Sequence, residues 1–220
     1  IGLGKKKDCQ NRSVVTTPTE IVKYMVDKTL SKVCEGKTPS EILNISVADI
    51  SCGSGIFLEE AFAYLQDYCV QWYICNGRTD HLIETGIDLY KLPIQEKKDI
   101  LCSCIYGIDI DIHAVEVAKF SLLIKLIEDE TAPSVSEVVP ILPDLGDNIQ
   151  FGNSLVSQAE LNGISGANHQ MMEIAPFDWN AINNGCGFDV IIGNPPYVNT
   201  EGMHTLLPST EVEVYKKKYK

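Results

Sequence analysis

The sequence predicts an α/β fold with a doubly wound, mainly parallel sheet. Short apolar runs that suit buried strands alternate with longer segments of helical periodicity, and the connections between strands are long. Gly53 and Gly55 form a turn between the first run and a helix, as tight βα connections do. Near the other end, Asn194-Pro195-Pro196-Tyr197 follows the run 188–193, which Val and Ile fill without polar alternation, as in a buried parallel strand.

The first elements can be justified from their ends. Residues 1–16 are polar and basic and are expected to be a loose lead-in. Thr17 is the expected N-cap of the first helix, because its hydroxyl can accept a backbone hydrogen bond and Pro18 suits the first turn. Apolar residues then recur at helical spacing up to Leu30. We expect next a loop over 35–44, a strand over 45–50 and a helix over 56–75.

The rest of the chain continues the alternation of strands and helices. The expected elements are a connector over 76–92, a short helix near 93–103, a strand over 104–108, a helix over 113–128, a proline-marked loop over 131–146, a strand over 149–151, a weakly ordered insertion over 156–186 and the fourth strand. Asp111 suits the N-cap of the helix over 113–128.

Composition limits the classes of function. A mean hydropathy near zero, no apolar run of about 18 residues and no signal peptide favour a cytoplasmic protein without a membrane span. The eight cysteines form no Cys-x-x-Cys pair, so we expect reduced, mostly buried thiols and no zinc site. The net charge of −12 argues against tight nucleic-acid binding by this chain alone, because phosphate contacts need a basic face.

Residues that can carry chemistry follow each of the four predicted strands. Gly53 and Gly55 come after the first strand, and Asp109 closes the second. Asn153 follows the third strand, and Asn194 follows the fourth. Because ligands bind beyond the carboxyl ends of strands in open parallel sheets, the sequence predicts one binding site at this edge.

The glycine loop argues against a dinucleotide. Leu58 stands where that fingerprint needs a third small residue, no P-loop pattern is present, and a plain tight turn remains an alternative. Asp49 would be costly to bury unpaired, and the ammonium of an amino-acid ligand would satisfy it. Asp109 is placed to accept the ribose hydroxyls of an adenosine, or else to cap the next helix. Asn153 suits an adenine edge or a simple turn.

The tetrapeptide at 194–197 predicts a stiff, extended turn, since each proline lacks an N–H and fixes φ. It presents an amide side chain, backbone carbonyls without nearby donors and an aromatic ring. Carbonyl acceptors beside a flat ring suit a planar substrate that bears an NH2 group, such as an amino-purine.

In this order, the motifs resemble a γ-class DNA adenine-N6 methyltransferase of restriction–modification systems, and most closely the Eco57I-like methylases. The matching stretches are 16–26 (TTPTEIVKYMV), 49–58 (DISCGSGIFL), 105–111 (IYGIDID), 152–155 (GNSL) and 192–197 (IGNPPY). Family loops usually carry Pro-Ala where Ile50 and Ser51 stand here, a departure that leaves the glycines in place.

The resemblance implies a class I S-adenosylmethionine-dependent methyltransferase fold and that cofactor. Its implied contacts are Thr17, Asp49, Cys52, Gly53 and Gly55 for the methionine part, Asp109 for the ribose, Ile110 for the adenine face and Asn153 for the adenine amino edge. On the substrate side, it implies an adenine flipped out of the duplex. The Asn194 side-chain oxygen and the Pro195 carbonyl would accept the N6 hydrogens, next to Pro196, and Tyr197 would stack on the base. No metal is implied.

The resemblance also implies an incomplete sheet, because the family sheet has seven strands and four are expected here. We expect a lead-in over 1–16, a partial catalytic domain over 17–200 and the start of a truncated segment over 201–220. Double-stranded DNA would be bound through a recognition domain absent from the chain, and the open edge of the fourth strand invites self-association. We therefore expect weak cofactor binding and no sequence-specific methylation by this piece alone.

Three alternatives stay open. A protein glutamine N5-methyltransferase also uses an NPPY turn, on an amide NH2 group. A non-catalytic cofactor-binding module is the second alternative, and a nicotinamide dehydrogenase is the third.

Overall fold

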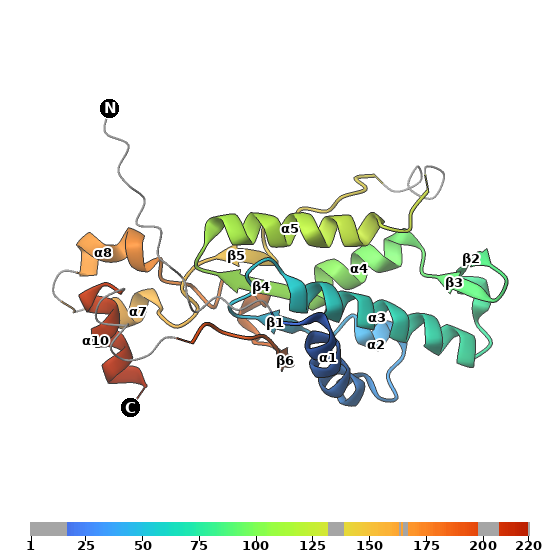
Figure 1. The fold of residues 1–220 in the computed structure, drawn as a ribbon, viewed down its shortest axis with the longest axis horizontal. Helices are drawn as coiled ribbons and strands as arrows, with labels where there is room; N and C mark the ends of the chain where they lie inside the picture. The colour runs from blue at the N-terminus through green and yellow to red at the C-terminus, as the bar shows by residue number, and fades with distance from the viewer. Residues whose placement is uncertain (1–16, 132–138, 163, 165–166, 198–206, 220) are drawn as a thin grey trace.

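The computed structural model describes residues 17–131, 139–162, 164, 167–197 and 207–219. A four-stranded sheet with strand order β5-β4-β1-β6 lies at its centre, and every neighbouring pair of strands is parallel. Helices α3, α4 and α5 run alongside this sheet, and the small helices α7, α8 and α10 gather at one end (Figure 1). The expected α/β class with a mainly parallel sheet is therefore confirmed.

The elements have the following bounds. The helices are α1 (Thr19–Cys34), α2 (Pro39–Ile42), α3 (Ile56–Cys75), α4 (Ile94–Cys104), α5 (Ile112–Ile127), α7 (Gln158–Leu161), α8 (Ala167–Ile174) and α10 (Ser209–Lys218), with 3-10 turns η1 (Thr79–His81) and η2 (Asn183–Gly185). The strands are β1 (Val47–Asp49), β4 (Ile105–Asp109), β5 (Ile149–Phe151) and β6 (Val190–Ile191), and β2 (Ile83–Gly86) pairs with β3 (Leu89–Lys91) in an antiparallel hairpin.

The main core lies between the sheet and the helices α1, α3, α4 and α5. Val22 and Leu30 of α1, Phe62 of α3 and Leu122 of α5 are fully buried in it, together with Val47 of the central strand. Their helical spacing explains why each helix turns one face toward the sheet. Among the described residues, none of the helices is both long and apolar enough to cross a membrane.

The segment expected to be a weakly ordered insertion is instead part of the fold. It contains α7, α8 and η2, and its Phe177 and Ile182 form a second buried cluster with Ile108 of β4. Trp179 packs edge-on against Phe177, with ring centroids 5.1 Å apart. Large apolar residues inside a polar segment thus cover part of the sheet, and the expectation of weak order is wrong for the described residues 156–162, 164 and 167–186, while 163, 165 and 166 lie outside the described residues.

Local expectations were wrong at three further places. Thr17 does not cap α1, because Pro18 occupies the N-cap position without any side-chain cap bond. The expected loop over 35–44 contains α2, which Thr38 and Glu41 begin with reciprocal capping hydrogen bonds. The fourth strand is regular only over Val190–Ile191, and the side chain of Asp189 before it accepts hydrogen bonds from the backbone N–H and hydroxyl of Ser46 (2.8 and 2.9 Å).

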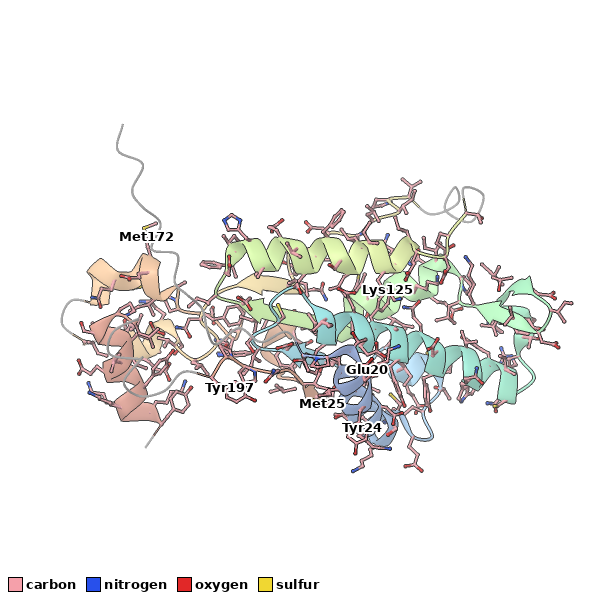
Figure 2. The ribbon with its side chains drawn as sticks, in the orientation of Figure 1. Glu20, Tyr24, Met25, Lys125, Met172 and Tyr197 are labelled. Atoms are coloured by element: carbon pink, nitrogen blue, oxygen red, sulfur yellow. The ribbon has the colours of Figure 1, made fainter. Side chains whose placement is uncertain are left out.

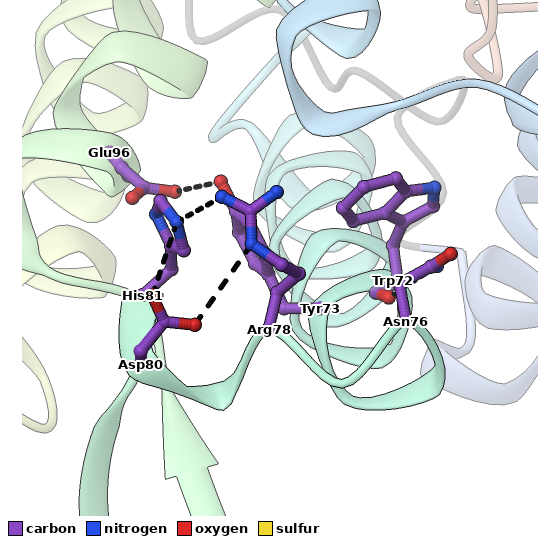
Figure 3. Close-up of polar contacts among 7 residues, drawn as sticks. All are labelled: Trp72, Tyr73, Asn76, Arg78, Asp80, His81 and Glu96. Carbon is purple, nitrogen blue, oxygen red and sulfur yellow. Dashed lines mark hydrogen bonds and ion pairs between the residues drawn. The ribbon is translucent and has the colours of Figure 1, made fainter.

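The expected connector over 76–92 contains the β2–β3 hairpin, which lies at the end of the molecule opposite α7, α8 and α10 (Figure 1). The ring of Tyr73 stacks on His81 at 5.1 Å, and its hydroxyl donates to Glu96 Oε2 at 3.2 Å (Figure 3). Burial raises the pKa of Tyr73 to about 12. These contacts join the end of α3 to α4 and the hairpin.

A buried charge cluster fixes the far end of α5. Glu130 lies 2.7 Å from Lys97 of α4 and 3.0 Å from Lys91 of β3, and its side chain is 2% exposed. Lys97 is nearly as buried, at 5% of its side-chain surface. Each charge therefore depends on the others for compensation.

Candidate functional site

The structure brings the residues after the four strands to one edge of the sheet. From one side to the other lie Asn153 after β5, Asp109 at the end of β4, the glycine loop after β1 and Asn194 after β6. The register aligns these ends, since Asp49 pairs with Gly107 and Asp109 pairs with Phe151. The expected row of residues is therefore present.

The glycine loop is tied to the end of β4. The backbone N–H of Gly53 donates to Asp109 Oδ2 at 2.8 Å, and that of Cys52 donates to the Ile108 carbonyl at 3.0 Å. Gly55 has a φ of +93°, and a Cβ there would lie 3.1 Å from the Cβ of Ala118 on α5. Gly55 thus supplies both the left-handed turn and the close packing of loop on helix.

Asp109 organises this edge with both carboxylate oxygens. Besides the bond from Gly53, its Oδ1 accepts from the backbone N–H of Asp111 at 2.8 Å. Asp111 in turn accepts from the His113 N–H at 2.8 Å, so its expected role as N-cap of α5 is confirmed. Because each carboxylate oxygen has two lone pairs, Asp109 can still accept hydrogen bonds from the hydroxyl groups of a ligand. Ile110 beside it is 51% exposed and offers an apolar surface.

Asp49 is a buried carboxylate without a cation. It is 2% exposed, accepts from the Ser51 N–H at 3.0 Å and forms no ion pair in the described part of the chain. Burial, aided by the nearby Asp109 carboxylate, raises the pKa of Asp49 to about 6. A positively charged ligand group would relieve this desolvation.

Gly193 was missed as a site residue by the sequence reasoning. It stands directly against Asp49, because a Cβ on Gly193 would collide with Oδ1 and lie 2.7 Å from Cγ. The available signal was a glycine that ends an apolar strand, which often marks a close approach of another group.

Two neighbouring side chains of the loop differ in character. The Ser51 hydroxyl oxygen is buried and, across the residues that the structure describes, is the one buried side-chain N or O atom without a hydrogen-bond partner. The Cys52 thiol is buried, and desolvation raises its pKa well above the usual range, so it is an inert packing group. The loop therefore has an unused polar atom next to Asp49.

Asn194 and Thr17 meet although they are 177 residues apart. The Asn194 Nδ2 donates to Thr17 Oγ1 at 3.0 Å, which places the start of α1 beside the turn after β6. Pro195, Pro196 and Tyr197 are exposed, and Tyr197 retains 76% of its surface. Figure 2 shows Tyr197 at the end of the sheet that faces the small helices.

Asn153 is held by a partner that the sequence did not reveal. Its Nδ2 donates to Glu211 Oε1 of α10 at 2.7 Å and lies 3.5 Å from the Tyr215 hydroxyl, while its Oδ1 accepts from the Leu155 N–H at 3.0 Å. Val214 of α10 packs in a small core with residues of α7 and α8, which fixes the helix there. Asn153 is thus not a free amide.

Other candidate sites lie away from this edge. A cavity of about 440 Å³ opens at the amino ends of β1 and β6, and one of about 160 Å³ lies between α3 and α4. Neither is lined by a residue of the carboxyl edge. Within the described ranges, no group of three or more His, Cys, Asp or Glu side chains is arranged to hold a metal ion.

Comparison with known proteins shows which proteins the chain resembles. Residues 103–220 match the sequence profile of the Eco57I restriction-modification methylase family. The chain is 45% identical over 215 residues to the type II restriction enzyme and methyltransferase RM.Eco57I of Escherichia coli, covering 98% of the chain and 20% of that protein. It is 33% identical over 137 residues to a putative type II restriction enzyme and methyltransferase of Methanocaldococcus jannaschii, covering 60% of the chain and 11% of that protein. The chain thus spans a fifth or less of these relatives.

Proposed function

Because the chain belongs to the Eco57I restriction-modification methylase family, we propose that it carries the methyl-transfer site of a DNA adenine-N6 methyltransferase that uses S-adenosylmethionine. The observation that carries this proposal is the hydrogen bond between Thr17 and Asn194. It joins the cofactor side of the edge to the turn that would receive the target base. We assign the catalytic domain to residues 17–200.

The residues at the edge suit this cofactor. The uncompensated carboxylate of Asp49 suits the cofactor ammonium, and the unpartnered Ser51 hydroxyl lies in the same loop. Asp109 retains lone pairs for the ribose hydroxyls, and the exposed Ile110 suits the adenine face. When bound, S-adenosylmethionine supplies an electrophilic methyl group on its sulfonium.

On the base side, this chain positions and polarises the target amine. The Asn194 side-chain oxygen and the Pro195 carbonyl accept the two N6 hydrogens of a flipped adenine, and Tyr197 stacks on the ring. In the arrangement seen, Asn194 Nδ2 donates to Thr17 Oγ1, which leaves Asn194 Oδ1 for the base. The Asn194 and Pro195 acceptors would draw the N6 lone pair out of conjugation, so that it faces the methyl group that bound S-adenosylmethionine would supply, and the displaced N6 proton would pass to water.

We assign the choice of DNA sequence to parts of the protein beyond these residues. The net charge of −12 leaves little basic surface for phosphate contacts. Restriction in the full protein is likewise proposed from the names of its relatives.

The test is methyl transfer by the full-length protein from labelled S-adenosylmethionine to double-stranded DNA, with N6-methyladenine measured in the digested product. Asn194→Ala should lower the rate about 10²–10³-fold, because one of two positioned acceptors is lost. Asn44→Ala, at an exposed amide away from the edge, is the matched control. Label in a protein glutamine instead of DNA, or an unchanged rate in Asn194→Ala, would refute the proposal.

A further inference from the structure

Helix α5 has apolar residues on its outer face as well as on the face that packs on the core. Val117, Phe120 and Ile124 lie on successive turns of the outer face, and all three are exposed. On the opposite face, Val115 and Leu122 are buried in the main core. Figure 1 shows α5 along the upper side of the molecule, so its outer face points away from the sheet.

The composition of α5 is unusual for a helix at a protein surface. Its polar side chains are His113, Glu116, Lys119, Ser121 and Lys125, and every other residue of the helix is apolar. A helix that is apolar all round is normally buried on all sides. Large apolar residues on three successive turns also form a continuous patch, whereas apolar residues scattered singly over a surface are ordinary. The outer face of α5 is therefore expected to be covered in the full-length protein.

The spacing of the exposed residues indicates the shape of the partner. Positions 117, 120 and 124 are separated by three and then four residues, which is the spacing at which one helix packs along another. The charges beside them are already compensated, because Glu116 lies 3.1 Å from Lys119 and Lys125 lies 2.6 Å from Glu128. A partner therefore needs apolar side chains rather than counter-charges. An amphipathic helix that turns its apolar stripe toward α5 has this chemistry.

Two observations favour a helix of the same polypeptide over a second copy of the chain. The matched region makes up 20% of the Escherichia coli relative, so four fifths of that protein lie outside it. A helix in the same polypeptide is present at a high effective concentration, whereas a second copy must be captured from solution. In addition, the net charge of −12 opposes the approach of an identical chain.

We propose that the outer face of α5 is the docking surface for an amphipathic helix from the part of the full-length protein beyond residues 1–220. The inference does not depend on the methyl transfer proposed for the carboxyl edge, because it rests on exposure, spacing and charge at another surface. It has a consequence for that edge, since α5 begins directly after its N-cap Asp111, whose N–H donates to Asp109. A helix docked on α5 would hold the start of α5 in place beside Asp109.

The test is photo-cross-linking of the full-length protein with p-benzoylphenylalanine in place of Phe120. Mass spectrometry of the digested product should show a cross-link to a segment outside residues 1–220 of the same molecule. The yield should be unchanged on about tenfold dilution, because the contact is intramolecular. Tyr24 on α1 is the matched control, since it is 64% exposed against 66% for Phe120 and lies beneath the charged Lys28. The same probe at Tyr24 should give no such cross-link.

Phe120→Ser provides a second measurement on the full-length protein. Loss of the docked helix should make the α5 amides exchange faster with solvent than in the wild type, and Tyr24→Ser should leave that exchange unchanged. Binding of S-adenosylhomocysteine should persist in Phe120→Ser, because Val115 and Leu122 still hold α5 on the core.

The inference requires both results. A cross-link from position 120 to a second copy, a cross-link to residues within 1–220, or no cross-link would overturn it. Equal cross-linking from Tyr24, or α5 exchange that is the same in Phe120→Ser and the wild type, would do the same. Failure of the wild-type protein to methylate DNA would refute the proposed function and leave the assignment of this surface standing.

Discussion

Replacing Asp49 by asparagine is expected to stabilise the ligand-free protein at neutral pH. Burial raises the pKa of Asp49 from 3.8 to about 6, a rise of roughly two pH units that corresponds to about 3 kcal/mol. Between these two values the folded protein binds more protons than the unfolded chain, so the stability of the wild type falls as pH rises. Asparagine has no charge to desolvate, so it avoids the free-energy cost of burying a carboxylate, and its side-chain oxygen can still accept the hydrogen bond from the Ser51 N–H.

The assay is urea unfolding across pH 4 to 7.5 without cofactor. Near pH 4 the variant and the wild type should be about equally stable, and above pH 6 the variant should gain about 3 kcal/mol. Asp27→Asn, at an exposed carboxylate beside Lys28, should change stability by less than about 1 kcal/mol at any pH. A less stable Asp49→Asn variant at pH 7.5, or a difference independent of pH, would refute the reasoning. The variant should also bind S-adenosylhomocysteine at least about tenfold more weakly, a trade of function for stability.

Two further substitutions test other contacts. Gly193→Ala should weaken cofactor binding, because the added Cβ would displace the Asp49 carboxylate. Binding is measured by calorimetry, and Gly86→Ala, in the distant hairpin, should bind the cofactor normally. Normal binding by Gly193→Ala would contradict the geometry. Glu130→Gln should lower the free energy of unfolding by about 3–5 kcal/mol, because Lys97 is left buried without a full counter-charge. The exposed Glu128→Gln should cost less than about 1 kcal/mol, and equal losses in the two variants would show that burial is not the cause.

Local patterns predicted the elements whose ends are set by nearby residues. The helix over 56–75 and the strand over 149–151 were placed at their observed bounds, because the glycine loop and a short apolar run define them. The row of residues along the carboxyl edge followed from the rule for parallel sheets, so its assembly was also predictable. The binding roles of the residues along this edge stay predictions.

Contacts between distant residues were not predictable in this way. The hydroxyl of Thr17 was assigned to a helix cap, but in the structure it accepts a hydrogen bond from the side-chain amide of Asn194, which lies 177 residues further along the chain. The amide of Asn153 is held by Glu211, 58 residues on, and nothing in the local sequence of α10 signals this. The hairpin was missed because its apolar residues do not reach the core; Ile87 is 93% exposed.

The pairing of β6 has a consequence for the order of folding. The hydrogen bond from Ser46 to Asp189 joins residues 143 positions apart, so strand β6 can add to the sheet only after a long loop has closed. We therefore expect the turn at Asn194 to form late, after β1, β4 and α3 have associated. A two-residue strand can also open locally while the rest of the sheet persists, and its amide hydrogens should exchange faster than those of β4. The proposed base-binding turn at Asn194 would then form and unfold at rates that differ from those of the core.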